Sequence, residues 1–346
     1  MIKFLQSFML VLALAMAALF HEVPGRAAVP SLSRWHRRLS LRAYVRLHGR
    51  LPALAGAASN FPAGVLSYGV PVESLALALS PYGDVWYVDG TNGSDTANNG
   101  RTPDTAYATL DKARTDSAAG DIIIIAPGTY TQTAAAQPLT PKARQVYIAA
   151  VQGYKPTVII TGTAEAVVVD VDVDGVSFIG IQFQADVDGV NQLVRVANTV
   201  AVSGLNFIGC WLDGNNKTSV DGISSVHATL AVTGLLVRGC RFKDIDNGII
   251  IGVSGMPLAL IERNVFECRA NADIGINLAD TTAYLTGYGY VVKENDFIGN
   301  AAAAPVGIAI AGTEDTTGGG IIRNNFFSFF TAAAITIDKL SRSEIK

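Results

Sequence analysis

Three aspartates recur in the second half of the chain, each just before an apolar strand that contains glycine. They are Asp221 in "DGISSV", Asp246 in "DNGIIIG" and Asp273 in "DIGINLA". Carboxylates that a repeat brings together could bind a ligand or a cation, and two of them at a suitable separation could hydrolyse a glycosidic bond. The basic residues nearest to them in the sequence are Arg241 and Lys243.

A second acidic group lies earlier in the chain. The stretch "VVVDVDVDGV" places Asp170, Asp172 and Asp174 before Gly175, as at the opening of a calcium-binding loop. Such a loop should have a glutamate at its twelfth position, where this chain has Ile181. Because alternating Val and Asp is also typical of a strand with one wet face, a calcium site and a surface strand both stay open.

The chain lacks the residue patterns that several other catalytic mechanisms require. The chain has four histidines, of which only His227 lies among the repeats, and it contains no G-x-S-x-G, H-E-x-x-H or P-loop motif. The three cysteines form no C-x-x-C pair, so we expect buried free thiols; a bond between Cys210 and Cys240 is the alternative in an oxidising compartment. We expect no cofactor, with calcium as the exception if the protein is a lyase.

The second half of the chain repeats a short phrase that ends in a large apolar residue, at spacings of 29, 30, 24, 31 and 29. The repeated positions are Phe183, Leu212, Phe242, Phe266, Phe297 and Phe326. A glycine motif follows with similar spacing at Gly222, Gly248, Gly275 and Gly307. These periods predict six stacked coils of short strands, about 4.8 Å apart.

Stacked coils should align equivalent residues into ladders. Two residues before the repeated positions stand Ile181, Cys210, Cys240, Asn264, Asn295 and Asn324. We interpret the asparagines as a structural ladder, because their side chains can bond to one another and to the turn backbone. Asp213, Lys243 and Glu267 form a second ladder of alternating sign, which favours an ion-pair role for Lys243.

The region before the repeats has the pattern of a cap. It predicts a strand at 85–88, a polar loop at 89–100, a helix at 110–118 with Thr109 as N-cap and Gly120 after its end, a strand at 122–125 and a turn at 127–130. This order resembles the N-terminal cap of right-handed parallel β-helix proteins of the pectate-lyase-like superfamily. The expected fold is therefore all-β, a single-stranded right-handed parallel β-helix with an N-terminal capping helix.

The resemblance implies one possible chemistry. In β-helix lyases, carboxylates on neighbouring coils hold calcium against a uronate while a Lys or Arg removes a proton. Here that assigns ligand binding to Asp221, Asp246 and Asp273 and the base to Lys243 or Arg241. The family's motifs around the base are absent, however, and the three acids are not strictly equivalent in the repeat. A non-catalytic protein is therefore the favoured interpretation, and a secreted polysaccharide lyase or glycoside hydrolase is the alternative.

The N-terminal part differs in composition from the rest. Residues 1–72 carry eight Lys and Arg against one acid, whereas the remainder has 18 basic and 28 acidic residues. Residues 1–27 resemble a secretory signal, with a single-helix anchor or a misplaced start as alternatives. Residues 28–53 repeat arginine every four positions, typical either of a segment on a membrane or nucleic acid or of a solvated linker. Residues 54–84 are expected to be a linker before the cap at 85–150, the coils at 151–338 and a tail at 339–346.

Partners and location follow from these features as expectations. The stretches "SNFPAGVLSYGVPVE" and "GDVWYVDGTNGSD" are similar to the start of β-helix proteins from tailed-phage structural gene clusters. This implies a virion or surface protein, with a polysaccharide or a surface protein as partner and a homo-oligomer as an option. We expect an extracellular or virion location, possible membrane contact through residues 8–51 and no specific nucleic-acid binding.

Overall fold

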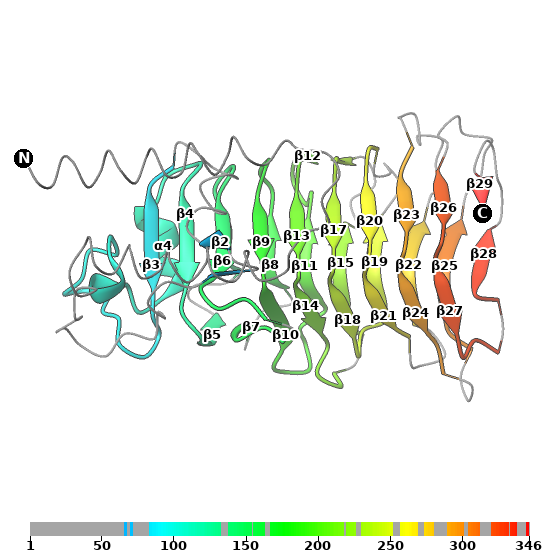
Figure 1. Cartoon of the computed structure of the whole chain (residues 1–346), viewed down its shortest axis with the longest axis horizontal. Coiled ribbons are helices and arrows are strands. Elements are labelled where there is room, and N and C mark those ends of the chain that lie inside the picture. The colour runs from blue at the N-terminus through cyan, green and yellow to red at the C-terminus, as the bar shows by residue number, and fades with distance from the viewer. Residues whose placement is uncertain are drawn as a thin grey trace, which may run out of the picture. The chain divides into compact units, whose positions relative to one another are not determined.

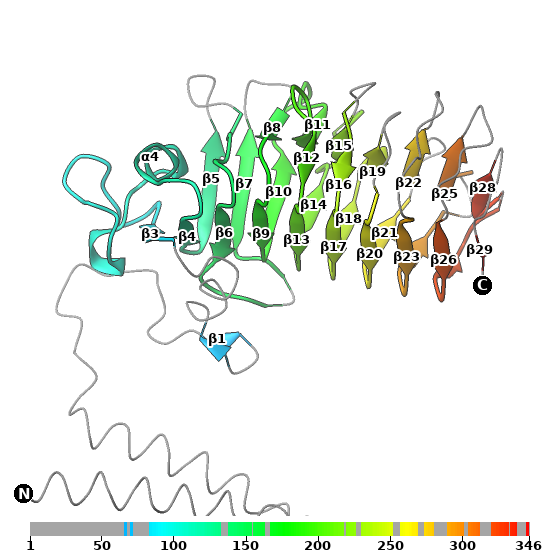
Figure 2. The same cartoon turned by 90° about the horizontal axis from the view of Figure 1, so that it is seen from above.

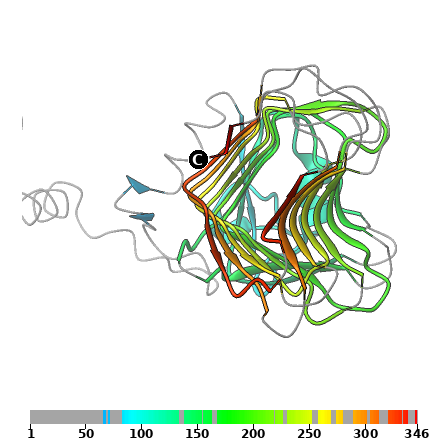
Figure 3. The ribbon, with the colours of Figure 1, turned by 90° about the vertical axis from the view of Figure 1, so that its right-hand side faces the viewer.

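The computed structural model shows a solenoid of parallel strands (Figure 1). It describes residues 83–132, 138–153, 155–162, 167–217, 219–225, 230–251, 257–268, 273–279, 289–300, 304–311, 320–331 and 333–337, with the short strands at 66–67, 70–71 and 344–345. From β6 onward, the coils pass through three sheets in the same order, which we call sheets 1, 2 and 3. Viewed along its axis, the strands of successive coils lie over one another (Figure 3).

Sheet 1 has ten strands in parallel register. They are β3 (Val85–Val88), β4 (Ile122–Ile125), β6 (Val146–Ala149), β9 (Ser177–Ile179), β13 (Asn206–Ile208), β17 (Leu236–Arg238), β20 (Leu260–Glu262), β23 (Val291–Lys293), β26 (Ile321–Arg323) and β29 (Glu344–Ile345).

Sheets 2 and 3 complete each coil. Sheet 2 contains β5 (Gly128–Gln132), β7 (Val158–Gly162), β10 (Ile181–Ala185), β14 (Trp211–Asp213), β18 (Arg241–Lys243), β21 (Val265–Glu267), β24 (Asp296–Ile298) and β27 (Phe326–Ser328). Sheet 3 contains β8 (Val167–Val171), β11 (Gln192–Val196), β15 (Asp221–Ser225), β19 (Asn247–Ile251), β22 (Ile274–Ala279), β25 (Val306–Ala311) and β28 (Ile335–Ile337). The predicted right-handed parallel β-helix is confirmed.

Four small strands lie outside these sheets. The pair β12 (Val202–Ser203) and β16 (Val232–Thr233) is parallel and joins two coils between sheets 3 and 1. The strands β1 (Leu66–Ser67) and β2 (Val70–Pro71) form an antiparallel hairpin.

The solenoid starts before the six repeats that the sequence displays. Sheet 2 begins with β5 and β7, two strands before β10, which contains the first repeated position, Phe183.

Stacked aromatic rings fill the core beneath sheet 2. The ring centroids of Phe242, Phe266, Phe297 and Phe327 follow one another at 4.5, 4.8 and 4.8 Å, close to the spacing of strands in a sheet. The prediction of Phe326 as the last repeated position was wrong by one residue. The register aligns Phe297 with Phe327, and Phe326 points outward with 63% of its surface exposed.

The glycine motif is explained by the next coil. A Cβ atom on Gly275 would lie 2.6 Å from the carbonyl oxygen of Gly307 and 2.8 Å from the ring of Phe297. Gly248 meets the same obstacles, the carbonyl of Gly275 and the ring of Phe266. These glycines therefore allow the backbone of sheet 3 to approach the phenylalanine stack.

The N-terminal cap largely follows the prediction. β3 and β4 have the expected bounds, and the α-helix α4 (Leu110–Asp116) lies at the N-terminal end of the solenoid and buries Leu110 and Ala113 (Figure 2). The Thr109 side chain caps it by accepting a hydrogen bond from the Lys112 amide at 3.2 Å. A 3₁₀ turn, η1 (Pro103–Thr105), precedes it.

Two details of the cap differ from the prediction. The helix ends at Asp116 with Ser117 as C-cap, whose amide donates to the Ala113 carbonyl, so Gly120 lies beyond the helix end. The predicted turn at 127–130 is mostly strand, because β5 already begins at Gly128 and pairs with β7.

The predicted signal (1–27), the arginine-rich segment (28–53) and nearly all of the predicted linker (54–84) lie outside the described residues. Within the part of the chain that the structure describes, no helix is long and apolar enough to span a membrane. Membrane contact through residues 8–51 stays a prediction.

Candidate functional site

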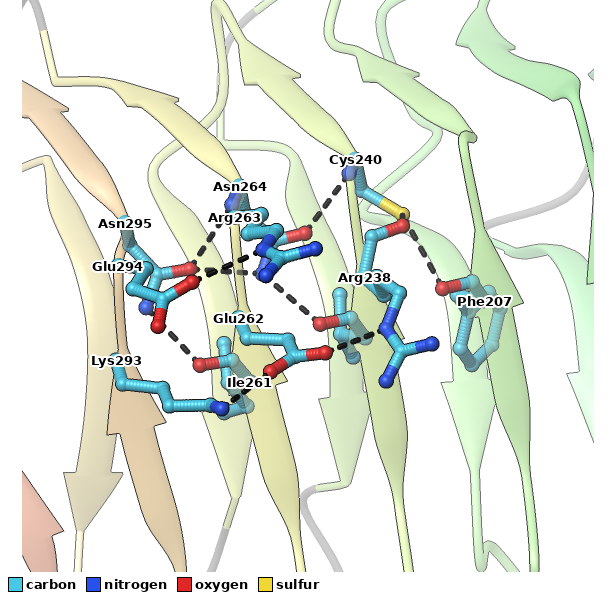
Figure 4. Close-up of polar contacts among 11 residues, drawn as sticks. Phe207, Arg238, Cys240, Ile261, Glu262, Arg263, Asn264, Lys293, Glu294 and Asn295 are labelled. Atoms are coloured by element: carbon cyan, nitrogen blue, oxygen red, sulfur yellow. Dashed lines mark hydrogen bonds and ion pairs between the residues drawn. The ribbon is translucent and has the colours of Figure 1, made fainter. Parts of the chain in front are cut away.

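The turn between sheets 1 and 2 contains the asparagine ladder (Figure 4). Asn264 and Asn295 are fully buried, and the Asn295 side-chain oxygen accepts hydrogen bonds from the Asn264 amide at 3.0 Å and from its side-chain nitrogen at 2.9 Å. Each side chain also donates to a backbone carbonyl, of Val237 and Ile261 respectively. The predicted ladder is thus present at these positions.

The last residue predicted for the ladder was wrong. Asn325, not Asn324, accepts from the Asn295 amide and side chain. Asn324 has φ 54° and occupies the left-handed turn position that Glu294 fills with φ 56° one coil earlier. The misplacement has the same origin as that of Phe326, because the last repeat is one residue longer than the sequence spacing indicated.

The cysteines start this ladder. Cys210 and Cys240 are buried free thiols whose sulfur atoms lie 3.3 and 3.4 Å from the carbonyl oxygens of Phe178 and Phe207. Burial raises the pKa of Cys240 well above its ordinary value. Burial, aided by the charge of Asp273, raises the pKa of the third free thiol, Cys268, to about 12. The raised pKa values suit the buried thiols of Cys240 and Cys268 to packing rather than to nucleophilic chemistry.

Ion pairs cross the coils on the outer face of sheet 1 beside this turn. Glu262 accepts from Lys293 at 2.9 Å and from Arg238 at 2.5 Å, and these bonds hold its pKa below the usual range. Arg263 pairs with Glu294 at 2.9 Å. Figure 4 shows both groups next to the ladder, where the Glu262 group joins consecutive strands of sheet 1 and the Arg263–Glu294 pair joins the turns that follow them.

The three aspartates predicted as possible calcium ligands each form hydrogen bonds with different partners. Asp170 on β8 forms two hydrogen bonds with Arg195 on β11, at 3.0 and 2.6 Å. Asp172 accepts from the amides of residues 198 and 199, and Asp174 from the amide and hydroxyl of Ser203. Each carboxylate thus fixes the following coil. Among the described residues, no group of three His, Cys, Asp or Glu could hold a metal ion.

The two candidate bases lie on the outer face of sheet 2. Lys243 places its Nζ atom 2.6 Å from Asp244 Oδ2 and 3.6 Å from Asp213 Oδ1. Arg241 pairs with Glu267, and its guanidinium lies 4.9 Å from the centre of the Trp211 ring. The register confirms the ladder of alternating sign from Asp213 through Lys243 to Glu267.

The acidic row Asp221, Asp246 and Asp273 lies at the start of sheet 3. Asp246 and Asp273 precede β19 and β22 at equivalent positions, whereas Asp221 is opposite Asn247 in the register. Burial, and then the charge of Asp273, raise the pKa of Asp246. Burial also raises the pKa of Asp221; the charge of Asp246 adds to this, while a 2.7 Å hydrogen bond from Asn247 opposes it. The three carboxyl groups therefore influence one another across coils.

Sequence reasoning missed a polar row beside these acids. Sheet 3 carries the partly exposed side chains of Gln192, Asn247 and Asn277 and the fully buried Ser224. Gln192 donates to the Ser224 hydroxyl at 2.9 Å, and Asn277 donates to the Asn247 side-chain oxygen at 3.0 Å. In the sequence, Asn247 stands two residues before the buried isoleucine of its glycine motif, and Ser224 and Asn277 stand one residue after theirs. This pattern can be recognised only once the register of the strands is known.

The sheets define the fold of the protein. Three parallel sheets wound as a solenoid make the chain a parallel β-helix. No protein-family model and no curated protein matches the sequence.

The chain is similar in structure to two polysaccharide lyases and a biosidase, at low sequence identity. The chain is similar to the PL6 family alginate lyase AlyGC (TM-score 0.43, 11% identity), covering 76% of this chain and 39% of that one. It is similar to the GH136 lacto-N-biosidase from Eubacterium ramulus (TM-score 0.39, 12% identity; 76% and 67%). It is also similar to the pectate lyase Pel9A (TM-score 0.34, 15% identity; 76% and 78%). The chain thus spans well under half the length of the alginate lyase.

Proposed function

We propose that this protein is a non-catalytic β-helix that binds a glycan chain along the outer face of sheet 3. The observation that carries the proposal is the set of partly exposed amide side chains of Gln192, Asn247 and Asn277 on β11, β19 and β22. Gln192 donates to the buried Ser224 hydroxyl, and Asn277 donates to Asn247. Amides and hydroxyls both donate and accept hydrogen bonds, as sugar hydroxyls require. Successive coils repeat at about 4.8 Å, so a ligand with repeated polar groups suits such a row.

The engagement of the candidate bases supports a non-catalytic role. A lyase base must reach the proton that it removes. Lys243 and Arg241 are instead held on sheet 2 by Asp213, Asp244 and Glu267, and these ion pairs account for both side chains without catalysis.

The charge of the surface favours a neutral glycan. Asp221, Asp246 and Asp273 form an acidic row next to the polar one, and a uronate-rich chain would bring like charges together. We therefore expect neutral polysaccharides to bind better than uronate-rich ones.

A glycoside hydrolase is the second candidate. The raised pKa values of Asp221 and Asp246, next to a third carboxylate, are the property that a carboxylic acid needs to protonate a leaving group. In this alternative Asp246 would be the acid, and replacing it with Asn would abolish turnover.

The location is also part of the proposal. We infer that the protein is located on a virion or cell surface, from the resemblance of residues 59–73 to phage-encoded β-helix proteins. Glycans are present at such surfaces, so a glycan-binding solenoid would meet its ligand there. Export of the full chain and its association with particles or cells test this part independently.

The test is glycan binding by the full chain. Isothermal titration against neutral and uronate-rich oligosaccharides should detect a neutral ligand, and Asn277→Ala should weaken it roughly three- to tenfold, as loss of one hydrogen bond does. The matched control is Asn206→Ala, which removes a half-buried amide from the outer face of sheet 1. Equal weakening by both variants, or tight binding that neither changes, would contradict the assignment to sheet 3.

A further inference from the structure

The outer face of sheet 3 combines carboxamide and aliphatic side chains on three neighbouring strands. In β19, β22 and β25, two register columns contain partly exposed side chains. One column carries Asn247, Ile274 and Val306, and the other carries Ile250, Asn277 and Ala309. The isoleucines between the two columns lie in the core: Ile249, Ile276 and Ile308. We call the six partly exposed side chains the amide–aliphatic patch.

The preceding strands of the same sheet have a different composition at these positions. In β8, β11 and β15, the column of Ile250 carries Asp170, Arg195 and Ser224, and the column of Asn247 carries Val167, Gln192 and Asp221. Val167 is the aliphatic residue among them, and it is buried. In the strands from β8 to β25, the partly exposed aliphatic side chains of these two columns therefore gather around Asn247 and Asn277.

The hydrogen bonds of the two asparagines run in one direction. Asn277 Nδ2 donates to Asn247 Oδ1 at 3.0 Å, and Asn247 Nδ2 donates to Asp221 Oδ1 at 2.7 Å. Among the residues that the structure describes, these bonds leave Asn277 Oδ1 as an acceptor, with Ile250 and Ala309 as its neighbours in the register. An acceptor between two aliphatic side chains suits a ligand group that has an N–H next to a methyl group.

We propose that the amide–aliphatic patch binds the acetamido group of a neutral, N-acetylated glycan. This inference rests on the proposed glycan-binding function and names the class of sugar. An acetamido group needs an acceptor for its N–H and an apolar contact for its methyl group. Asn277 supplies the acceptor, and Ile250 and Ala309 supply the apolar contact.

Two other classes of glycan fit the patch less well. A glycan that has only hydroxyl groups would place some of them against the aliphatic side chains, where they lose hydrogen bonds to water without gaining a partner. A glycan of de-N-acetylated amino sugars would bring ammonium groups, which the carboxylates of Asp221 and Asp246 would attract but the aliphatic side chains would not.

Titration with three tetrasaccharides of the same linkage tests the proposal. The probes for isothermal titration of the full chain are N-acetylchitotetraose, cellotetraose, which has hydroxyl groups in place of the acetamido groups, and the de-N-acetylated chitosan tetramer. We expect N-acetylchitotetraose to bind about tenfold more tightly than cellotetraose, because one hydrogen bond and one buried methyl group each contribute several-fold.

The possible results separate this inference from the proposed function. Equal or tighter binding of cellotetraose, or tightest binding of the chitosan tetramer, would overturn the acetamido assignment and leave glycan binding in place. If another neutral oligosaccharide binds and none of these three does, the acetamido assignment also fails alone. If no oligosaccharide binds, the proposed function fails together with it.

A matched pair of variants tests the apolar contact. Ile250→Thr keeps a β-branched side chain on the strand but replaces part of its aliphatic surface with a hydroxyl. It should weaken binding of N-acetylchitotetraose several-fold and change binding of cellotetraose little. Ile321→Thr makes the same replacement on the outer face of sheet 1, where Ile321 is 39% exposed, and should change neither. Ala309→Ser repeats the test with a smaller change if Ile250→Thr does not fold. Unchanged binding of N-acetylchitotetraose by the folded variant, or an equal loss for both sugars, would refute the contact.

Discussion

Replacing Asn295 with alanine should be one of the most damaging single changes in the solenoid. Its side chain takes part in four hydrogen bonds: two to Asn264, one to the Ile261 carbonyl and one to Asn325. Asn295→Ala would leave the buried Asn264 amide without its partner and remove a donor from the Ile261 carbonyl. At about 1–3 kcal/mol for each buried group left unsatisfied, we expect a loss of about 2–5 kcal/mol in the free energy of unfolding.

Equilibrium unfolding in urea, followed by far-UV circular dichroism, would measure the loss. The control is Asn324→Gly, because Asn324 is exposed and has φ 54°, a conformation that glycine adopts without strain; we expect a change of less than about 0.5 kcal/mol. A loss below about 1 kcal/mol for Asn295→Ala, or an equal loss for the control, would refute the ladder as a source of stability.

A cysteine at the same position gives a graded test. Cys240 occupies this ladder position one coil before Asn264, and its sulfur lies 3.4 Å from the Phe207 carbonyl oxygen. Asn295→Cys should therefore retain a weak donor toward the Ile261 carbonyl and destabilise less than Asn295→Ala. The opposite order would show that the donor to that carbonyl does not matter.

Three further changes test separate parts of the structure. Thr109→Ala removes the cap of α4 and should cost about 1 kcal/mol in thermal or urea unfolding, whereas Thr109→Ser should cost little. Gly275→Ala forces a Cβ atom against the next coil and should cost about 2 kcal/mol or more; normal stability would mean that sheet 3 can move away from Phe297. Because the pKa of Asp221 is raised in the folded protein, its protonated carboxyl contributes to the free energy of unfolding. This contribution is fully present below about pH 3.8 and is lost as the pH rises through the pKa of the folded protein. Asp221→Asn should therefore gain melting temperature relative to the unaltered protein as pH rises from about 4 to 7, and a constant difference would contradict the shift.

The repeat made the coils predictable. Large apolar residues at nearly constant spacing place Phe242, Phe266 and Phe297 in one stack, because a solenoid imposes the same environment on equivalent positions. The prediction failed where the period changed by one residue, at Phe326 and Asn324. A repeat with variable loops fixes the order of its strands better than the register of its last coil.

The surface was harder to predict than the core. Sequence spacing correctly aligned Asp213, Lys243 and Glu267, but the partnership of Asp170 with Arg195 joins residues 25 positions apart and depends on the register of β8 and β11. The polar row at Gln192, Ser224, Asn247 and Asn277 follows no constant spacing, because the loops between sheets differ in length. Its members become neighbours only when the coils are stacked.

The engagement of the candidate bases in ion pairs underlies the proposed non-catalytic role. Asp221 and Asp246 lie at the start of sheet 3, whereas Arg241 and Lys243 are engaged on sheet 2. Ion pairs of partly exposed side chains contribute little to stability, so their replacement should leave the fold intact and allow a clean assay of function.

The most direct test of the central claim is a turnover assay with folded full-length protein. It would be incubated with neutral and acidic polysaccharides, with and without calcium, while new reducing ends and the absorbance of unsaturated uronates are followed. We predict binding of a neutral glycan with no product of either kind. Product that disappears in Lys243→Ala would establish a lyase, product that disappears in Asp246→Asn would establish a hydrolase, and either result would contradict the non-catalytic account.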